Sequence, residues 1–271
     1  MREARNRLNF FNKFMPQKFQ QLKKAKRLKK SSQKWLLRQV NDPFVEKAKI
    51  EGWRSRAAFK IIEIDQKFKI FKPGKVVVDL GAAPGGWSQY AVTKVGEGNV
   101  VGIDLLEIDS IPGVTFLQQD FLAEDAAEKI ISEIKNRRRK FNANSTMESS
   151  QMRDLPLIKG AGGMVNIVLS DMAANTTGDH QTDHMRIIAL LEEALILAEK
   201  ILKEGGVFVG KIFQGGSSNE ILKRLRESFS VVKYFKPDSS RKDSSETYLV
   251  AVGFKSKNSE LEIRKEILRK S

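Results

Sequence analysis

Residues 76–90 restrict what this chain can fold into more than any other segment. A valine-rich run with the character of a buried strand is followed by Gly81, Gly85 and Gly86, and an amphipathic helix begins near Trp87. A buried strand that turns directly into a helix is the first βα unit of a doubly wound α/β domain. The glycines permit the tight turn and let a ligand approach the backbone closely.

The rest of the chain repeats this alternation. Strands are predicted at 75–80, 99–104, 114–117, 164–170, 206–213, 230–235 and 247–254, and helices at 87–94, 124–135, 185–203 and 218–228. Because the pattern closes with two consecutive strands, we predict an α/β, Rossmann-like fold: a mostly parallel seven-stranded sheet with one antiparallel strand and helices on both faces. Ligands of such sheets bind at the carboxyl ends of the strands.

The remaining segments flank or interrupt one domain. We predict a basic N-terminal arm at 1–30, the main domain at 31–255 with a helical stretch at 31–72, and a C-terminal tail at 256–271. Between 137 and 163 the periodicity fails in a run of basic, Asn, Ser and Gly residues, which indicates a flexible surface insertion. Its basic cluster is either part of a solvated loop or an RNA contact.

The charge distribution points to a polyanionic partner. The formal net charge is +15, and residues 1–40 hold most of the surplus, with 13 Lys or Arg and one acid. A surplus of this size favours binding to nucleic acid. The arm reads equally well as a solvated tail or as a segment that touches RNA. Its Arg-rich, acid-poor start also resembles an organelle transit peptide, although Lys outnumbers Ser in it.

Several classes of protein are disfavoured by what the sequence lacks. It has no Cys, hence no disulfide framework and no cysteine zinc site, and no run approaches the roughly 20 apolar residues that span a membrane. We therefore expect a cytoplasmic protein. His180 and His184 lie four apart, but no third ligand fits the spacing, so we expect no metal. No long apolar seam is left after the core is assigned, which predicts a monomer.

The glycine loop has the spacing G-x-x-x-G-G, which differs from the dinucleotide fingerprint and from the phosphate loop of nucleoside triphosphatases. A glycine loop of this kind, followed by an acid at the end of the second strand, is typical of S-adenosylmethionine sites. Asp104 is that acid, placed to bond both ribose hydroxyls. Asp120, after the third strand, is placed to bind the adenine amino group, and Asp171, after the fourth, to face the methionyl ammonium and the sulfonium. Each acid taken singly is equally well explained as a helix or turn cap.

Five segments together resemble one known family. They are R-S-R-A-A-F-K at 54–60, D-L-G-A-A-P-G-G-W-S-Q at 79–89, S-D-M-A at 170–173, K-I-F-Q-G at 211–215 and K-P-D-S-S-R at 236–241. The chain is similar in these segments to the FtsJ/RrmJ (RlmE) family of S-adenosylmethionine-dependent RNA ribose 2′-O-methyltransferases. The resemblance runs from about residue 31 to residue 254 apart from the insertion, and it implies the class I methyltransferase fold.

The resemblance also implies a set of site residues. The family's K-D-K-E catalytic tetrad corresponds to Lys60, Asp171, Lys211 and Glu246, and its contacts to S-adenosyl-L-methionine correspond to Gly85, Trp87, Asp104, Asp120 and Asp171. Two departures bear on the site. Ala174 stands where family members usually have Pro, which affects the turn beside the reacting centre, and the longer insertion affects the approach of the substrate. Neither removes a reacting group.

The chemistry of ribose methylation agrees with this assignment. A ribose 2′-hydroxyl is a poor nucleophile at neutral pH, so methyl transfer needs in-line positioning and a base. Lysine accepts a proton only in its neutral form, which burial beside a second cation favours. Lys211 is the predicted base, and Lys60 is the neighbouring cation that orients the ribose or an adjacent phosphate. Asp171 is expected to hold Lys211, and Glu246 to organise both lysines. Taken singly, either lysine is more typical of a solvated surface position, and the shared motif context favours the catalytic reading.

The substrate follows from the resemblance and not from the site. Bacterial members of the family imply a uridine in the peptidyl-transferase A loop of 23S rRNA, in the large (50S) ribosomal subunit. Specificity for RNA then depends on shape and on basic contacts, for which Arg54, Arg56, Lys236 and Arg241 are candidates. A tRNA 2′-O-methyltransferase of the same family and a noncatalytic RNA-binding factor for ribosome assembly are the alternatives. A nicotinamide-dependent oxidoreductase is disfavoured by the missing fingerprint.

Overall fold

The structure is a computed structural model that describes residues 36–144, 163–173, 177–213, 219–241 and 244–256. The predicted N-terminal arm, residues 145–162 of the predicted insertion, Ala174 and residues 257–271 of the predicted tail lie outside this part of the chain. In the described part, no helix is both long and apolar enough to cross a membrane.

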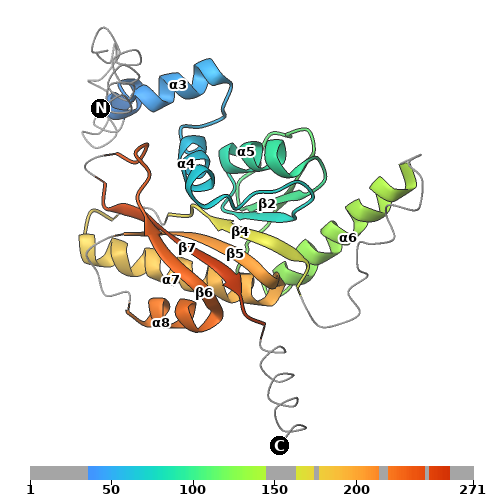
Figure 1. Cartoon of the computed structure of the whole chain (residues 1–271). Helices are drawn as coiled ribbons and strands as arrows, with labels where there is room; N and C mark the ends of the chain where they lie inside the picture. The colour runs from blue at the N-terminus through green and yellow to red at the C-terminus, as the bar shows by residue number, and fades with distance from the viewer. Residues whose placement is uncertain (1–35, 145–162, 174–176, 214–218, 242–243, 257–271) are drawn as a thin grey trace, which may run out of the picture.

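The centre of the molecule is one seven-stranded sheet with the order β3-β2-β1-β4-β5-β7-β6 (Figure 1). Its strands are β1 Val77–Leu80, β2 Val100–Asp104, β3 Val114–Gln118, β4 Val165–Ser170, β5 Leu202–Phe213, β6 Phe229–Phe235 and β7 Glu246–Phe254. Strand β7 is antiparallel to both of its neighbours, and β1 to β5 pair in parallel. The α/β class and the single antiparallel strand are therefore confirmed. The chain moves from β1 outward to β3 and then back to β4, which makes the β1/β4 boundary the switch point of the sheet.

Helices cover both faces of this sheet. They are α3 Pro43–Glu51, α4 Ala58–Phe68, α5 Gly86–Val95, α6 Ala126–Asn144, α7 His180–Ile201 and α8 Asn219–Ser228. Figure 1 shows α4 and α5 over one face and α7 and α8 over the other, and α6 packs against α7 and β2. Each layer buries its own hydrophobic core against the sheet. Strands covered on both faces are nearly continuous in apolar residues, as parallel strands of this class are.

Alternate side chains of one strand belong to opposite cores. On β5, Val207 and Val209 pack in the core that contains α4 and α5, whereas Phe208 and Ile212 pack in the core that contains α7 and α8. Because side chains alternate along a strand, Lys211 lies on the α4 side of the sheet, two residues beyond Val209. The same rule decides which polar side chains meet at the site described below.

The helical stretch predicted at 31–72 is divided into shorter helices. Residues 36–40 are helical, and Asp42 then caps α3, where its carboxylate accepts a hydrogen bond from the Phe44 N–H at 3.0 Å. Helix α3 ends at Gly52, which adopts a left-handed φ of 74°. Helix α4 then starts after a bend. Lys60 therefore lies on a different helix from the residues of α3.

Most element boundaries lie within two residues of those predicted, and three differ by four residues or more. Helix α6 continues from residue 135 to Asn144, so the predicted insertion begins with helix and not with loop. Helix α7 begins at His180 and not at 185, because Asp179 caps it through a 3.0 Å hydrogen bond from the Thr182 N–H. Strand β5 begins at Leu202, where it pairs with β4, and not at 206. Both histidines thus lie in α7, and the described residues hold no group of three or more metal-ligating side chains.

Candidate active site

Strand register brings three of the four predicted tetrad residues together. Asp171 follows β4 directly, and Ser170 pairs with Gly210, so Asp171 lies beside Lys211 of β5. On the other side Lys211 pairs with Tyr248 of β7, two residues from Glu246. Because side chains alternate along a strand, the side chains at 171, 211, 246 and 248 all lie on the face of the sheet that α4 covers. Lys60 comes from α4 itself, which packs on this face.

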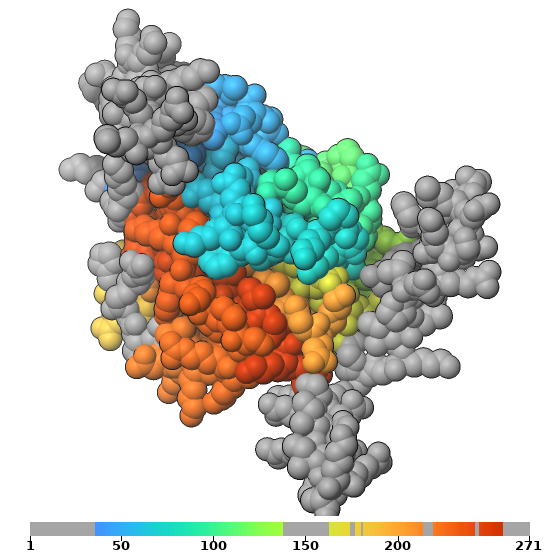
Figure 2. Space-filling view, in the orientation of Figure 1, coloured from blue at the N-terminus to red at the C-terminus, as the bar shows by residue number. Residues whose placement is uncertain are grey.

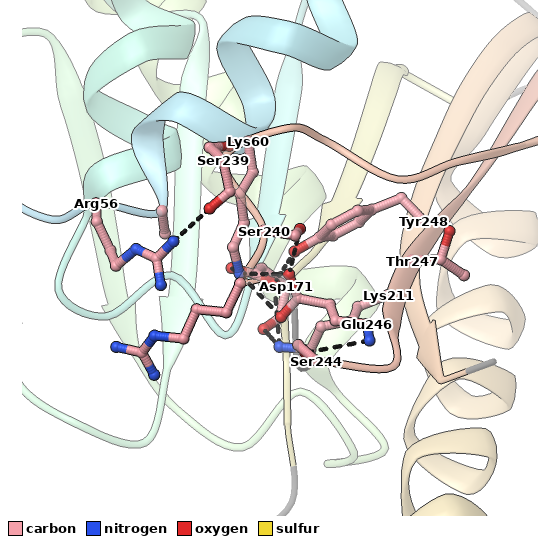
Figure 3. Close-up of polar contacts among 12 residues, drawn as sticks. Arg56, Lys60, Asp171, Lys211, Ser239, Ser240, Ser244, Glu246, Thr247 and Tyr248 are labelled. Carbon is pink, nitrogen blue, oxygen red and sulfur yellow. Dashed lines mark hydrogen bonds and ion pairs between the residues drawn. The ribbon is translucent and has the colours of Figure 1, made fainter. Parts of the chain in front are cut away.

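The four side chains form one continuous polar network (Figure 3). The Lys211 ammonium nitrogen lies 3.0 Å from Asp171 Oδ1 and donates a 2.6 Å hydrogen bond to the Asp171 carbonyl. The Lys60 nitrogen lies 2.8 Å and 3.0 Å from the two oxygens of Glu246 and 3.6 Å from Asp171 Oδ2. Lys60 therefore faces two carboxylates, and Lys211 faces one.

Two further side chains complete the network. The Tyr248 hydroxyl donates a 2.7 Å hydrogen bond to Asp171 Oδ1, and the Ser240 hydroxyl lies 3.0 Å from Glu246 Oε1. Burial, together with the neighbouring charges of Asp171 and Glu246, raises the pKa of Tyr248 well above its ordinary value, so its hydroxyl keeps its proton at neutral pH and acts as a donor.

Asp171 is ionised in this environment. Burial on its own raises its pKa, but the charges of Lys211 and Lys60 and the hydrogen bond from Tyr248 outweigh burial, so the pKa of Asp171 lies below its ordinary value. Its side chain is 17% exposed and lies at the carboxyl end of β4. The centre of the network is thus a fixed negative charge that is held by two lysines.

Helix α4 is held in place by the loop that follows β6. Glu63, three residues after Lys60 on the same helix face, accepts hydrogen bonds from the backbone N–H groups of Asp238 and Ser239. Burial raises the pKa of Glu63, although these hydrogen bonds oppose the rise. Phe68 packs edge to face on Phe235 of β6, with ring centroids 5.7 Å apart. Figure 2 shows the resulting contact between the cyan N-terminal layer and the orange C-terminal strands.

A cavity of about 720 Å³ opens at the carboxyl ends of β1 to β4. Three of its acidic lining residues are those predicted for the cofactor, namely Asp104, Asp120 and Asp171, and its apolar lining includes Ile103, Leu105, Leu106, Phe121, Leu122 and Met172. Asp104 also accepts hydrogen bonds from the N–H groups of Ala83 and Leu106, each at 2.9 Å. The size falls within the range of small-molecule sites, and a few polar groups on a mostly apolar wall are typical of them.

Two residues of the glycine loop, Gly81 and Ala83, line this cavity. Gly81 lines it with a left-handed φ of 70°, and a Cβ at this position would overlap the Met172 side chain. Gly85, with φ of 101°, is the N-cap residue of α5. Arg54 fixes the outside of the loop, because its guanidinium donates to the carbonyls of Pro84, Asp109 and Ser110.

Two predicted cofactor residues lie beside the cavity and not among its described lining residues. Gly85 is in the turn, and the Trp87 ring is buried, with its N–H bonded to the Ala57 carbonyl at 2.9 Å and its ring 5.6 Å from that of Tyr248. Contacts from Gly85 and Trp87 to a cofactor therefore stay predictions. The Trp87 side chain has an observed packing role, since it joins α4, α5 and β7.

A second cavity, of about 250 Å³, lies beside Lys60 and Glu246. Among the residues that the structure describes, its lining is Gln39, Arg56, Lys60, Arg241, Ser244 and Glu246, and none of these lines the first cavity. Asp171 lines the first cavity, whereas Lys60 and Glu246 line the second. The polar network of the tetrad therefore reaches both cavities, and Lys211 is not among the described lining residues of either one.

Sequence reasoning did not identify several residues of the network. Tyr248 could have been found, because it lies two residues after Glu246 in a predicted strand and so faces the same side. No sequence signal connected Asp42 with Arg241 or Glu63 with Ser239, since each of these pairs is separated by more than 170 residues along the chain. Asp79 is 1% exposed and accepts a 2.7 Å hydrogen bond from Ser88. Its burial, helped by the charges of Asp171 and Asp104, raises its pKa to about 7.

Comparison with known proteins places this geometry in a family. A model of FtsJ-like methyltransferases matches residues 53–254. A protein named ribosomal RNA large subunit methyltransferase E from Rhodopseudomonas palustris (strain BisA53) is 48% identical over 238 residues, which are 86% of this chain and 90% of the relative. The protein of the same name from Rickettsia bellii (strain RML369-C) is 48% identical over 244 residues, 88% of this chain and 96% of the relative. A solved ribosomal RNA methyltransferase from Plasmodium falciparum has a TM-score of 0.55 and 27% identity, and the match covers 74% of this chain and 98% of that one. The chain is therefore a methyltransferase and belongs to the FtsJ-like methyltransferase family.

Proposed function

We propose that this methyltransferase transfers a methyl group from S-adenosylmethionine to a ribose 2′-hydroxyl of ribosomal RNA in the large subunit, at a uridine of the 23S A loop. The observation that carries the proposal is that the polar network of the tetrad reaches both cavities. A transfer enzyme needs its reacting groups between donor and acceptor sites. The relatives' names, which specify ribosomal RNA of the large subunit, support the substrate.

The larger cavity fits S-adenosylmethionine. This cofactor combines an adenine, a ribose diol and a sulfonium, and the cavity offers apolar walls from Leu105 and Phe121 and carboxylates from Asp104, Asp120 and Asp171. We assign Asp104 to the ribose hydroxyls, Asp120 to the adenine amino group and Asp171 to the positive end. When bound, the cofactor supplies an electrophilic methyl group.

The remaining steps belong to the side chains of this chain. Lys211 is the proposed base, which takes the 2′-hydroxyl proton on its nitrogen as the oxygen attacks. Lys60 faces two carboxylates, an arrangement suited to a cation, whereas Lys211 faces one and is the better candidate to act as a neutral amine. Asp171 fixes Lys211 through two hydrogen bonds, and Glu246 fixes Lys60. Because these groups contact one another directly, replacing any one of them changes the surroundings of the other three.

Methyl transfer from labelled S-adenosylmethionine tests the proposal. The acceptors are large ribosomal subunits, naked 23S rRNA and bulk tRNA, all from cells that lack the modification. We expect label in the ribosomal substrate, located at a ribose by nuclease digestion and mass spectrometry. Label in tRNA would instead establish a tRNA methyltransferase, and cofactor binding without transfer to any acceptor would favour a noncatalytic assembly factor.

Two further properties follow from this function. We propose that the protein acts in the cytoplasm as a monomer, because its substrate is the assembled subunit and one chain supplies both cavities. Light scattering should give the mass of one chain, 30.6 kDa, at every concentration. A stable dimer would contradict the proposed monomer.

A further inference from the structure

The second cavity carries an excess of positive charge. Arg56, Arg241 and Lys60 line it, and Glu246 is its one acidic lining residue among those the structure describes. Glu246 is already paired with Lys60 and bonded by Ser240. At about 30 Å³ for each water molecule, the cavity of about 250 Å³ has room for roughly eight waters. That volume suffices for a small anionic group and part of what it is attached to.

The two arginines share one carboxylate oxygen. Asp42 Oδ2 lies 2.9 Å from Arg56 Nη1 and 3.1 Å from Arg241 Nε. Arg241 also donates to Gln39 Oε1 at 3.2 Å, and Arg56 donates to the Ser239 carbonyl. Each guanidinium has five N–H donors, so a single shared carboxylate leaves donors without acceptors within the described part of the chain. Counting Asp42 with the charged residues that line the cavity, three cations face two carboxylates.

We propose that this cavity binds a phosphodiester group of the RNA that flanks the reacting ribose, with Arg56 and Arg241 as its principal donors. The inference deepens the proposed function and rests on it. A guanidinium group can form a bidentate contact, in which two parallel N–H donors bind two oxygens of one phosphate. Lys60 belongs both to this cavity and to the tetrad, so a phosphate here would lie next to a ribose held at Lys211. A ribose 2′-hydroxyl is never far from a phosphate, because the adjacent 3′ oxygen carries one.

The arginines are held before any RNA binds. Asp42, whose side chain is 6% exposed, caps α3 and so fixes both guanidiniums to the start of that helix. Glu63 holds the backbone of Asp238 and Ser239, whose carbonyl in turn accepts from Arg56. Burial and the nearby charge of Arg241 lower the pKa of Arg56, an electrostatic strain that a bound anion would relieve. Groups fixed in this way lose little entropy on binding.

The structure also separates these arginines from the other two basic candidates. Arg54 uses its guanidinium on three backbone carbonyls of the loops around the cofactor cavity. Lys236 donates to the Ser244 carbonyl at 2.8 Å. Neither lines the second cavity. Of the four cations predicted as phosphate contacts, Arg56 and Arg241 are the pair that the geometry assigns to the reacting nucleotide.

The test is the salt dependence of binding to large ribosomal subunits that lack the modification, at constant magnesium. The variants are Arg241→Gln, Arg241→Lys and, as a charge-matched control, Arg226→Gln, an exposed position on α8 at the opposite face of the sheet. A lost phosphate contact lowers the slope of log Kd against log salt by about 0.7 to 0.9. For Arg241→Gln we expect that change and a Kd raised roughly tenfold to hundredfold. Arg241→Lys should keep the slope with an intermediate Kd, and Arg226→Gln should match wild type.

Two results would overturn the phosphate site. One is an Arg241→Gln slope equal to that of Arg226→Gln, whatever the Kd, and the other is an Arg241→Lys variant that binds no better than Arg241→Gln. Affinity for S-adenosylmethionine should stay within twofold in every variant, which shows that each is folded. If wild type transfers methyl groups but Arg241→Gln keeps the full slope, the phosphate site alone is wrong. If wild type neither binds nor methylates these subunits, the proposed function is wrong.

Discussion

Asp79→Asn should change how the stability of the protein depends on pH. Asp79 is 1% exposed on β1, and burial raises its pKa to about 7. In the unfolded chain the same carboxyl has a pKa of about 3.9. Between these values the folded protein keeps the proton that the unfolded chain has released. The folded state is therefore stabilised by this group at low pH, and the contribution is lost as pH rises toward 7.

The size of the effect follows from the shift. The folded protein holds the extra proton between pH about 3.9 and pH about 7. Raising pH from 5 to 8 covers about two pH units of this range, and each unit is worth about 1.36 kcal/mol. The free energy of unfolding of wild type should therefore fall by about 3 kcal/mol, a loss that Asp79→Asn does not share. The amide carries no charge at either pH, and its oxygen can still accept from Ser88. Any constant penalty from the new N–H donors cancels when the two pH values are compared.

Urea unfolding of both proteins at pH 5 and pH 8, without cofactor, measures this difference. The free energy of unfolding of Asp79→Asn relative to wild type should rise by about 3 kcal/mol between the two pH values. Asp125→Asn is the control, because Asp125 is exposed and its partners Lys129 and Gln119 lie at the surface. An Asp79→Asn difference that is the same at both pH values would refute the argument that Asp79 is buried with its proton.

Three other substitutions test separate parts of the site. Tyr248→Phe removes the hydroxyl bonded to Asp171, which keeps Lys211 as a partner, so the free energy of unfolding should fall by only about 1 kcal/mol. Because the pKa of Asp171 then moves upward toward its ordinary value, acid unfolding of Tyr248→Phe should begin at a higher pH than in wild type, and an unchanged acid transition would argue against this. Gly81→Ala places a methyl group against Met172 at a φ of 70° and should cost about 2–4 kcal/mol in urea unfolding, whereas Gly205→Ala, also at positive φ but in open space, should cost less. Asp104→Ala should weaken S-adenosylmethionine binding about tenfold to hundredfold in calorimetry, and an affinity within twofold of wild type would remove Asp104 from the cofactor site.

Sequence periodicity was sufficient to predict the sheet because buried strands carry strong local patterns. The run at 164–170 and the run at 247–254 have apolar residues on both faces, and both became central strands with nearly the predicted bounds. Since side chains alternate with a period of two along a strand, Asp171, Lys211 and Glu246 all lie on the same face of the sheet. The pairing of β4, β5 and β7 then brings the three residues close together. Helix ends were predicted less well, as at His180, because a cap such as Asp179 depends on one side chain and not on a repeated pattern.

Contacts between distant segments could not be predicted in this way. Asp42 meets Arg241 across most of the chain, and Glu63 meets Ser239, because α3, α4 and the loop after β6 converge in three dimensions. Neither acid lies in one of the five segments that carry the family resemblance. Trp87 shows the opposite case, since its motif marked it as a cofactor residue while its ring packs against Tyr248 and bonds the Ala57 carbonyl. A motif can mark a residue as a ligand contact without showing whether its backbone or its side chain makes the contact.

The most direct test of the central claim, that Lys211 in the tetrad removes the ribose proton, is the single-turnover rate of methyl transfer by Lys211→Met with saturating S-adenosylmethionine and large ribosomal subunits. Methionine keeps the length of the side chain and removes its nitrogen, and the exposed strand lysine Lys233→Met on β6 is the matched control. We expect the rate of Lys211→Met to fall by about 10² to 10⁴, with cofactor and subunit affinities within twofold of wild type and with Lys233→Met unchanged. A Lys211→Met rate within tenfold of wild type would contradict the account and remove Lys211 as the base.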